Sequence, residues 1–126
     1  MARFGQADSV TLRCLFVDDS EEFLASAARL LESQGIEIVG HAKTGEEALA
    51  LAAALEPDIA LVDIELAEED GIAVAEALEA RTPSTRVVLI SAYERDDLSE
   101  LISGSRAVGF IPKSALGADA IFGLLA

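Results

Sequence analysis

The chain has 126 residues, of which 52% are hydrophobic and 25% are charged, and its formal net charge is −14. This length suits a single domain that buries roughly two-thirds of its unfolded surface in one core. The apolar content excludes a disordered chain. The excess of acids repels phosphate backbones and anionic lipid heads, so this domain is not expected to contact nucleic acid or a membrane directly.

The N-terminus and the single cysteine bear on the location of the protein. Residues 1–10 lack the apolar core of a signal peptide, and no apolar run reaches the roughly 18 residues of a membrane span. We expect these residues to form a tail in front of one domain, residues 11–126. Cys14 lies in the first apolar segment and is interpreted as a reduced core residue. These features predict a cytoplasmic protein.

Short apolar segments alternate with longer helical ones along the chain. Strands are predicted at 13–17, 37–42, 59–63, 87–91 and 108–111. The first, third and fourth are apolar on both faces, which is typical of parallel strands covered by helices on both sides. Helices are predicted over 20–35, 44–57, 71–81, 94–105 and 114–126.

Two of these helices have clear start signals. Ser20 can cap the first, and Thr44 with Glu47 forms a capping box for the second. The order of strand and helix, repeated five times, predicts right-handed crossovers and a doubly wound α/β fold with a parallel sheet covered on both faces.

Polar residues follow the predicted strands at the point where ligands bind in such folds, the carboxyl ends. These residues are Asp18, Asp19, Asp63, Ser91 and Lys113. Three carboxylates this close together cannot all stay ionised without a cation, and Mg²⁺ prefers oxygen ligands of this kind. A lysine and a hydroxyl beside a carboxylate and Mg²⁺ suit the acceptance of a phosphoryl group, which an aspartate can carry covalently.

Each of these residues also has a structural interpretation. The aspartate pair can cap the next helix, Asp63 can begin a turn, Ser91 can be structural, and Lys113 can be a solvated surface residue. Their joint placement at four strand ends favours a site. His41 has no second ligand near it in the sequence and is interpreted as a surface residue.

Four motifs together resemble the receiver domain of two-component response regulators: "LFVDDSEEF", "PDIALVDIELAEEDGIAVAEAL", "VVLISAY" and "GFIPKS". The resemblance covers roughly residues 11–126. It implies a flavodoxin-like sheet with strand order 2-1-3-4-5, Mg²⁺ as cofactor, a sensor histidine kinase as partner, and a homodimer. The motif "GFIPKS" also resembles the variant found in receivers joined to a helix-turn-helix transcription domain, which implies transcription regulation.

The resemblance implies a role for each residue of the acidic site. Asp63 would be the phosphoacceptor. Asp19 would bind Mg²⁺ directly, and Asp18 would bind it directly or through water. Asp63 and the backbone carbonyl of Glu65 would complete the protein ligands.

Further residues would act on the phosphoryl group or respond to it. Lys113 would contact the acidic cluster and then the phosphoryl group. Ser91 would hydrogen-bond a phosphoryl oxygen, with help from the backbone N–H groups of Ile64 and Ala92. Phe110 matches the aromatic switch residue that turns inward when Ser91 moves, although core packing alone would also explain it.

The sequence departs from the family pattern near the phosphoacceptor. Leu66 and Ala67 replace a Met-Pro pair, which predicts a looser loop. Glu65 and Tyr93 flank the site at positions that vary in the family and affect phosphoryl lifetime, and a carboxylate at Glu65 could orient or repel an attacking water. The acid run 68–70 is expected to be a solvated loop.

Three functions remain open. The first is a phosphorylation switch, which is not an enzyme, although it catalyses its own phosphorylation and slow dephosphorylation. Phosphorylation of this switch would change the surface made by 94–105, 108–111 and the last helix. The second is a phosphate-independent interaction or dimerisation module, and the third a hydrolase with Asp63 as nucleophile. A flavin carrier is disfavoured because an acidic "DDSEEF" would repel phosphate. Two settings of the chain also stay open: a stand-alone receiver, or a part of a transcription factor.

Overall fold

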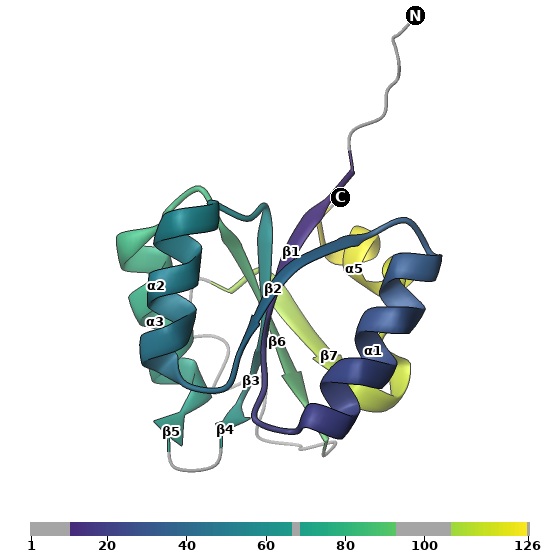
Figure 1. Cartoon of the computed structure of the whole chain (residues 1–126), viewed down its shortest axis with the longest axis horizontal. Coiled ribbons are helices and arrows are strands. Elements are labelled where there is room, and N and C mark those ends of the chain that lie inside the picture. The colour runs from purple at the N-terminus through teal and green to yellow at the C-terminus, as the bar shows by residue number, and fades with distance from the viewer. Residues whose placement is uncertain (1–10, 67–68, 93–106, 126) are drawn as a thin grey trace, which may run out of the picture.

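The computed structural model describes residues 11–66, 69–92 and 107–125. Its main sheet has five parallel strands in the order β2-β1-β3-β6-β7 (Figure 1). Their bounds are β1 Arg13–Val17, β2 Glu37–Ala42, β3 Ile59–Asp63, β6 Arg86–Ser91 and β7 Gly109–Pro112. Counted along the chain, this is the order 2-1-3-4-5, so the predicted doubly wound, flavodoxin-like sheet is confirmed.

Helices cover both faces of the sheet (Figure 1). On one face lie α1 Glu21–Ser33 and α5 Ala118–Leu125, and on the other lie α2 Gly45–Leu55 and α3 Gly71–Arg81. The predicted helix over 94–105 falls outside the described residues. In the described part of the chain, no helix has the length and apolar character needed to cross a membrane.

The last helix begins later than the sequence suggested. Lys113–Ala115 form a single 3₁₀ turn, and α5 starts only at Ala118. The Ala118 N–H donates to the side-chain oxygen of Gln34 at the end of α1, 2.7 Å away. A tertiary contact therefore caps α5, because Gln34 satisfies one of the N–H groups that a helix start leaves without an internal partner.

The core forms one apolar cluster on each side of the sheet. Leu15 and Val17 of β1 pack in the cluster under α2 and α3, whereas Cys14 and Phe16 pack in the cluster under α1 and α5. All four side chains are fully buried. This two-sided burial explains why the central strands are continuously apolar, since successive side chains of a strand point to opposite faces.

Both predicted helix caps are present. The Ser20 hydroxyl accepts from the Phe23 N–H at 3.2 Å, and the Thr44 hydroxyl accepts from the Glu47 N–H at 3.2 Å. The Glu47 carboxylate returns to the N–H of Lys43 at 2.8 Å, one residue before the cap. The start of α2 is therefore held from both directions.

A short antiparallel hairpin follows β3. It joins β4 Glu65–Leu66 to β5 Glu69–Asp70, and Leu66 is buried in the core under α2 and α3. Ala67 and Glu68 lie outside the described residues. The sequence predicted a looser loop here, but at Leu66 the chain is held both by strand pairing and by burial.

Two acids of the hairpin bind helix starts. Both oxygens of Glu69 accept the Gly45 N–H of α2 at 3.1 Å, and Asp70 accepts the Ile72 N–H of α3 at 2.9 Å. Both acids are exposed as expected, but they form the strand β5 where the sequence predicted a loop. The capping was not predicted. It arises because helix N-termini carry unpaired N–H groups and a partial positive charge that attract carboxylates.

Candidate functional site

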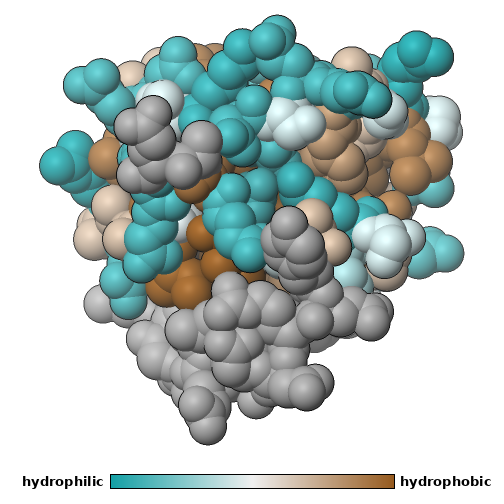
Figure 2. Space-filling model, turned by 90° about the horizontal axis from the view of Figure 1, so that it is seen from below, coloured by the Kyte–Doolittle hydropathy of each residue, from teal (hydrophilic) through white to brown (hydrophobic). Residues whose placement is uncertain are grey.

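The carboxyl ends of the parallel strands meet at one edge of the sheet, the lower edge in Figure 1. Figure 2 looks onto this edge and shows hydrophilic residues across its middle. Asp18 and Asp19 follow β1, and Asp63 ends β3. One carboxylate oxygen from each of the three lies within 4.8 Å of the others. The structure thus brings together the three predicted acids, which we call the aspartate cluster.

Asp63 is the best-anchored member of the cluster. Its Oδ1 accepts the Glu65 N–H at 2.9 Å, its Oδ2 lies 3.2 Å from Lys113 Nζ, and only 4% of the residue is exposed. Burial raises the pKa of Asp63, the Glu65 N–H and Lys113 lower it, and the charge of Asp18 raises it. The net pKa lies above the ordinary value of 3.8 because desolvation dominates.

Asp18 is the most deeply buried member of the cluster. The residue is fully buried, and its Oδ1 accepts the Ser20 N–H at 2.8 Å. Its Oδ2 pairs with Lys113 Nζ at 2.6 Å, and no other group among the described residues donates to it. A buried carboxylate oxygen with one ionic partner keeps a lone pair that can bind a metal ion.

The donor set fits Mg²⁺. This ion takes oxygen ligands, binds one or two carboxylates directly and usually keeps several waters. The cluster offers three carboxylates, of which Asp19 is the most exposed. The backbone carbonyl of Glu65 stays a predicted fourth ligand.

Lys113 stands between the acids. Its Nζ contacts Asp18 and Asp63, and it also lies 4.3 Å from the centre of the Phe23 ring. Burial lowers the pKa of Lys113, but the contacts with Asp18 and Asp63 outweigh burial and bring the net pKa above its ordinary value. The ammonium therefore stays charged and offsets part of the negative charge of the cluster. Phe23 stands four residues after Asp19, in the first turn of α1, and its contact with Lys113 was not predicted.

The hydrogen-bond partners of Ser91 and Ile64 differ from those that were predicted. Ser91 ends β6 fully buried, and its hydroxyl donates to Glu65 Oε1 at 2.8 Å. This contact was not predicted, although Glu65 stands two residues after Asp63, the spacing of residues on one side of an extended strand. The Ile64 N–H, expected to contact a phosphoryl group, donates to the Ile90 carbonyl at 2.9 Å. In this arrangement the sheet already uses that donor.

Phe110 lies in β7, paired with Leu89 of β6. It is half-buried and packs against the core under α2 and α3. The observed packing is that of a core residue at the end of the sheet. The role of Phe110 as a switch stays a prediction.

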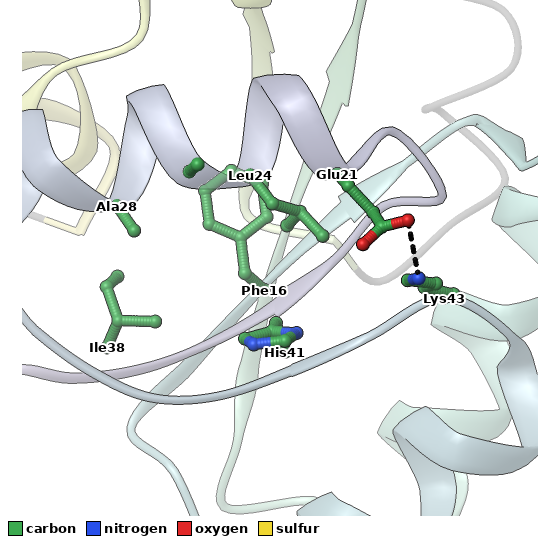
Figure 3. A pocket seen from close by; sticks show the side chains of 8 residues that line it. Phe16, Glu21, Leu24, Ala28, Ile38, His41 and Lys43 are labelled. Atoms are coloured by element: carbon green, nitrogen blue, oxygen red, sulfur yellow. Dashed lines mark ion pairs between the residues drawn. The ribbon is translucent and has the colours of Figure 1, made fainter.

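A separate cavity of about 350 Å³ lies between α1 and β2 (Figure 3). Phe16 and Leu24 are among its apolar walls, and Glu21 pairs with Lys43 at 3.1 Å beside it. His41 also lines it and is exposed, which confirms its interpretation as a surface residue. No residue of the aspartate cluster lines this cavity, so the chemistry described above lies elsewhere.

Comparison with known proteins agrees with this geometry. Residues 14–122 match the family model of the response regulator receiver domain. The protein-glutamate methylesterase/protein-glutamine glutaminase 2 of Methanospirillum hungatei JF-1 is 38% identical over 98 residues, which are 77% of this chain and 27% of that protein. The response regulator GacA of Pseudomonas aeruginosa is 30% identical over 105 residues, 82% of this chain and 49% of that protein.

A solved structure shows the same similarity. The signal receiver domain of NarL from Mycobacterium tuberculosis superposes with a TM-score of 0.79 at 32% identity, covering 91% of this chain and 94% of that one. The chain spans between about a quarter and a half of the two curated relatives. The matched region contains the aspartate cluster, Ser91 and Lys113. The chain therefore belongs to the family of response regulator receiver domains.

Proposed function

We propose that this chain is a phosphorylation-switched signalling domain in which Asp63 accepts a phosphoryl group from a sensor histidine kinase when Mg²⁺ is bound. The observation that carries the proposal is the position of the Asp63 carboxylate, which lies within the aspartate cluster and 3.2 Å from Lys113 Nζ. Receiver domains of response regulators are phosphorylated by histidine kinases and bind Mg²⁺ in an acidic pocket.

The reaction is a phosphoryl transfer between two side chains. A carboxylate oxygen of Asp63 attacks the phosphorus of a phosphohistidine, a P–O bond forms, and the P–N bond breaks. Its electron pair returns to the imidazole nitrogen, which takes up a proton from solvent. Bound Mg²⁺ supplies positive charge to the oxygens of the transferred group. Asp18, Asp19, Asp63 and the Glu65 carbonyl would hold the ion.

Lys113 and Ser91 act on the phosphoryl group once it is on Asp63. Lys113 already contacts the Asp63 carboxylate, so its ammonium needs only a small movement to reach a phosphoryl oxygen. The Ser91 hydroxyl then moves toward the phosphoryl group and Phe110 follows. This movement changes the face made by β7 and α5, together with the predicted helix over 94–105, which lies outside the described residues. Such a switch couples a local change in charge to a distant surface.

For the output we propose control of transcription from a cytoplasmic, homodimeric receiver that makes no DNA contact of its own. The proposal relies on the motif "GFIPKS" and on the strongly acidic charge. An esterase output, as the name of the Methanospirillum relative describes, is the alternative. The sequence of the full-length protein would distinguish the two.

Phosphorylation is tested by incubating the chain with acetyl phosphate and Mg²⁺ and measuring its intact mass. The wild type should gain the mass of one phosphate, and EDTA should prevent the gain. Asp63→Asn should gain nothing, whereas Asp119→Asn, which changes an exposed acid at the start of α5, should behave as the wild type. A gain on Asp63→Asn would identify a different acceptor. No gain on any variant, with Mg²⁺ bound, would favour the phosphate-independent module.

A further inference from the structure

The Ser91 hydroxyl already has an acceptor within the protein. Ser91 is fully buried, and its Oγ donates to Glu65 Oε1 at 2.8 Å. A serine hydroxyl has one hydrogen to donate. A phosphoryl oxygen on Asp63 and the Glu65 carboxylate would therefore compete for the same hydrogen.

The Glu65 carboxylate is held in position by its own backbone. The Glu65 N–H donates to Asp63 Oδ1 at 2.9 Å, and Glu65 pairs with Asp70 across the hairpin of β4 and β5. Asp70 in turn caps α3. Glu65 is half-buried, and its side chain reaches from β4 to Ser91 at the end of β6. It is thus placed against Ser91 by fixed elements on both sides.

We propose that Glu65 is a positioning residue that holds Ser91 in the resting state, so that switching requires Ser91 to transfer its hydrogen bond from Glu65 to the phosphoryl group. The proposal rests on the proposed function of Asp63 and deepens it. A carboxylate accepts a stronger hydrogen bond than a neutral group does, so this contact biases the domain toward the resting state.

General electrostatic repulsion is the rival explanation. A negative charge at Glu65 would disfavour any incoming phosphoryl group, whatever Ser91 does. Both explanations predict that the phosphoryl state becomes easier to reach when the carboxylate is removed. They differ in whether that gain requires the Ser91 hydroxyl.

A double-mutant cycle distinguishes the two explanations. The probe is beryllofluoride, an analogue of the phosphoryl group, titrated with saturating Mg²⁺ into the wild type, Glu65→Ala, Ser91→Ala and the double variant. Glu65→Ala should bind it about tenfold more tightly than the wild type, as expected from release of a hydrogen bond to a charged acceptor. In the Ser91→Ala background, Glu65→Ala should change the affinity little. Glu37→Ala, which removes an exposed charge at the start of β2, should bind as the wild type does.

Several results would overturn the proposal. Equal gains in both backgrounds would mean repulsion alone, and no gain in the wild-type background would mean that the contact does not restrain Ser91. Failure of the wild type to bind beryllofluoride, together with failure to gain phosphate, would overturn the proposed function and the inference together. If the wild type binds but the cycle fails, the inference alone is overturned.

A second measurement needs no metal or phosphate analogue. The same four proteins are unfolded with urea in EDTA. If Glu65 and Ser91 are bonded in the resting state, the two single substitutions should destabilise the protein by more in sum than the double variant does. Additive effects would show that the resting bond contributes nothing and would overturn the proposal.

Discussion

Gly71 is the position where one added methyl group should do the most damage. It is the first residue of α3, and its N–H donates to the Ile64 carbonyl at 2.9 Å. A Cβ at this position would overlap the carbonyl oxygen of Asp63 and would lie 2.7 Å from both Cα and the carbonyl oxygen of Ile64. The start of α3 therefore lies directly against the backbone of Asp63 and Ile64.

The atoms that a Cβ at Gly71 would contact determine how much stability Gly71→Ala should lose. The three heavy atoms nearest to the new Cβ all belong to backbone, so rotating a side chain cannot relieve the overlap. Forcing extra carbon into a packed site costs typically 1–3 kcal/mol, and we expect Gly71→Ala to lie at the upper end, about 3 kcal/mol. Replacing glycine by alanine inside a helix returns only about 0.5–1 kcal/mol. The net expected loss in the free energy of unfolding is about 2 kcal/mol or more.

Urea unfolding in EDTA, followed by circular dichroism, measures this loss. Gly123→Ala is the matched control, because Gly123 lies in α5 with no atom within 4 Å of a Cβ built there. That control should be neutral or more stable by up to about 1 kcal/mol. Gly71→Ala within about 0.5 kcal/mol of the wild type, the range of ordinary surface substitutions, would refute the reasoning. So would an equal loss in both variants.

Two further predictions concern titratable groups. Because burial raises the pKa of Asp63 above 3.8, the metal-free folded chain binds more protons than the unfolded chain, and stability from this group falls as pH rises from 3.8 through the folded pKa. Asp63→Asn should thus be more stable than the wild type at neutral pH in EDTA and should lose this advantage in acid. Unfolding curves measured across a pH series test this. A difference in the free energy of unfolding between the two proteins that stayed constant with pH would contradict it. Burial also raises the pKa of the Cys14 thiol to about 12, so a thiol reagent should label Cys14 only after unfolding, and rapid labelling of the folded chain at mildly alkaline pH would show that the residue is accessible.

The sequence by itself determined the order of elements, the sheet and the residues at its carboxyl edge. Apolar runs long enough for one strand each, separated by capped helices, allow few arrangements, because crossovers between parallel strands are right-handed. The carboxyl ends of parallel strands must then meet at one edge. For that reason the sequence alone places Asp18, Asp19 and Asp63 together, and the structure brings them within reach of one ion.

Only the tertiary structure decided how the polar groups at that edge are paired. The Ser91 hydroxyl donates to Glu65, and the Ile64 N–H is used by the sheet. Glu69 caps α2, which lies 24 residues earlier in the chain. These pairings depend on distances between side chains of different elements. Periodicity and caps describe one element at a time, so they show which residues reach the edge but not which partner each hydrogen bond takes.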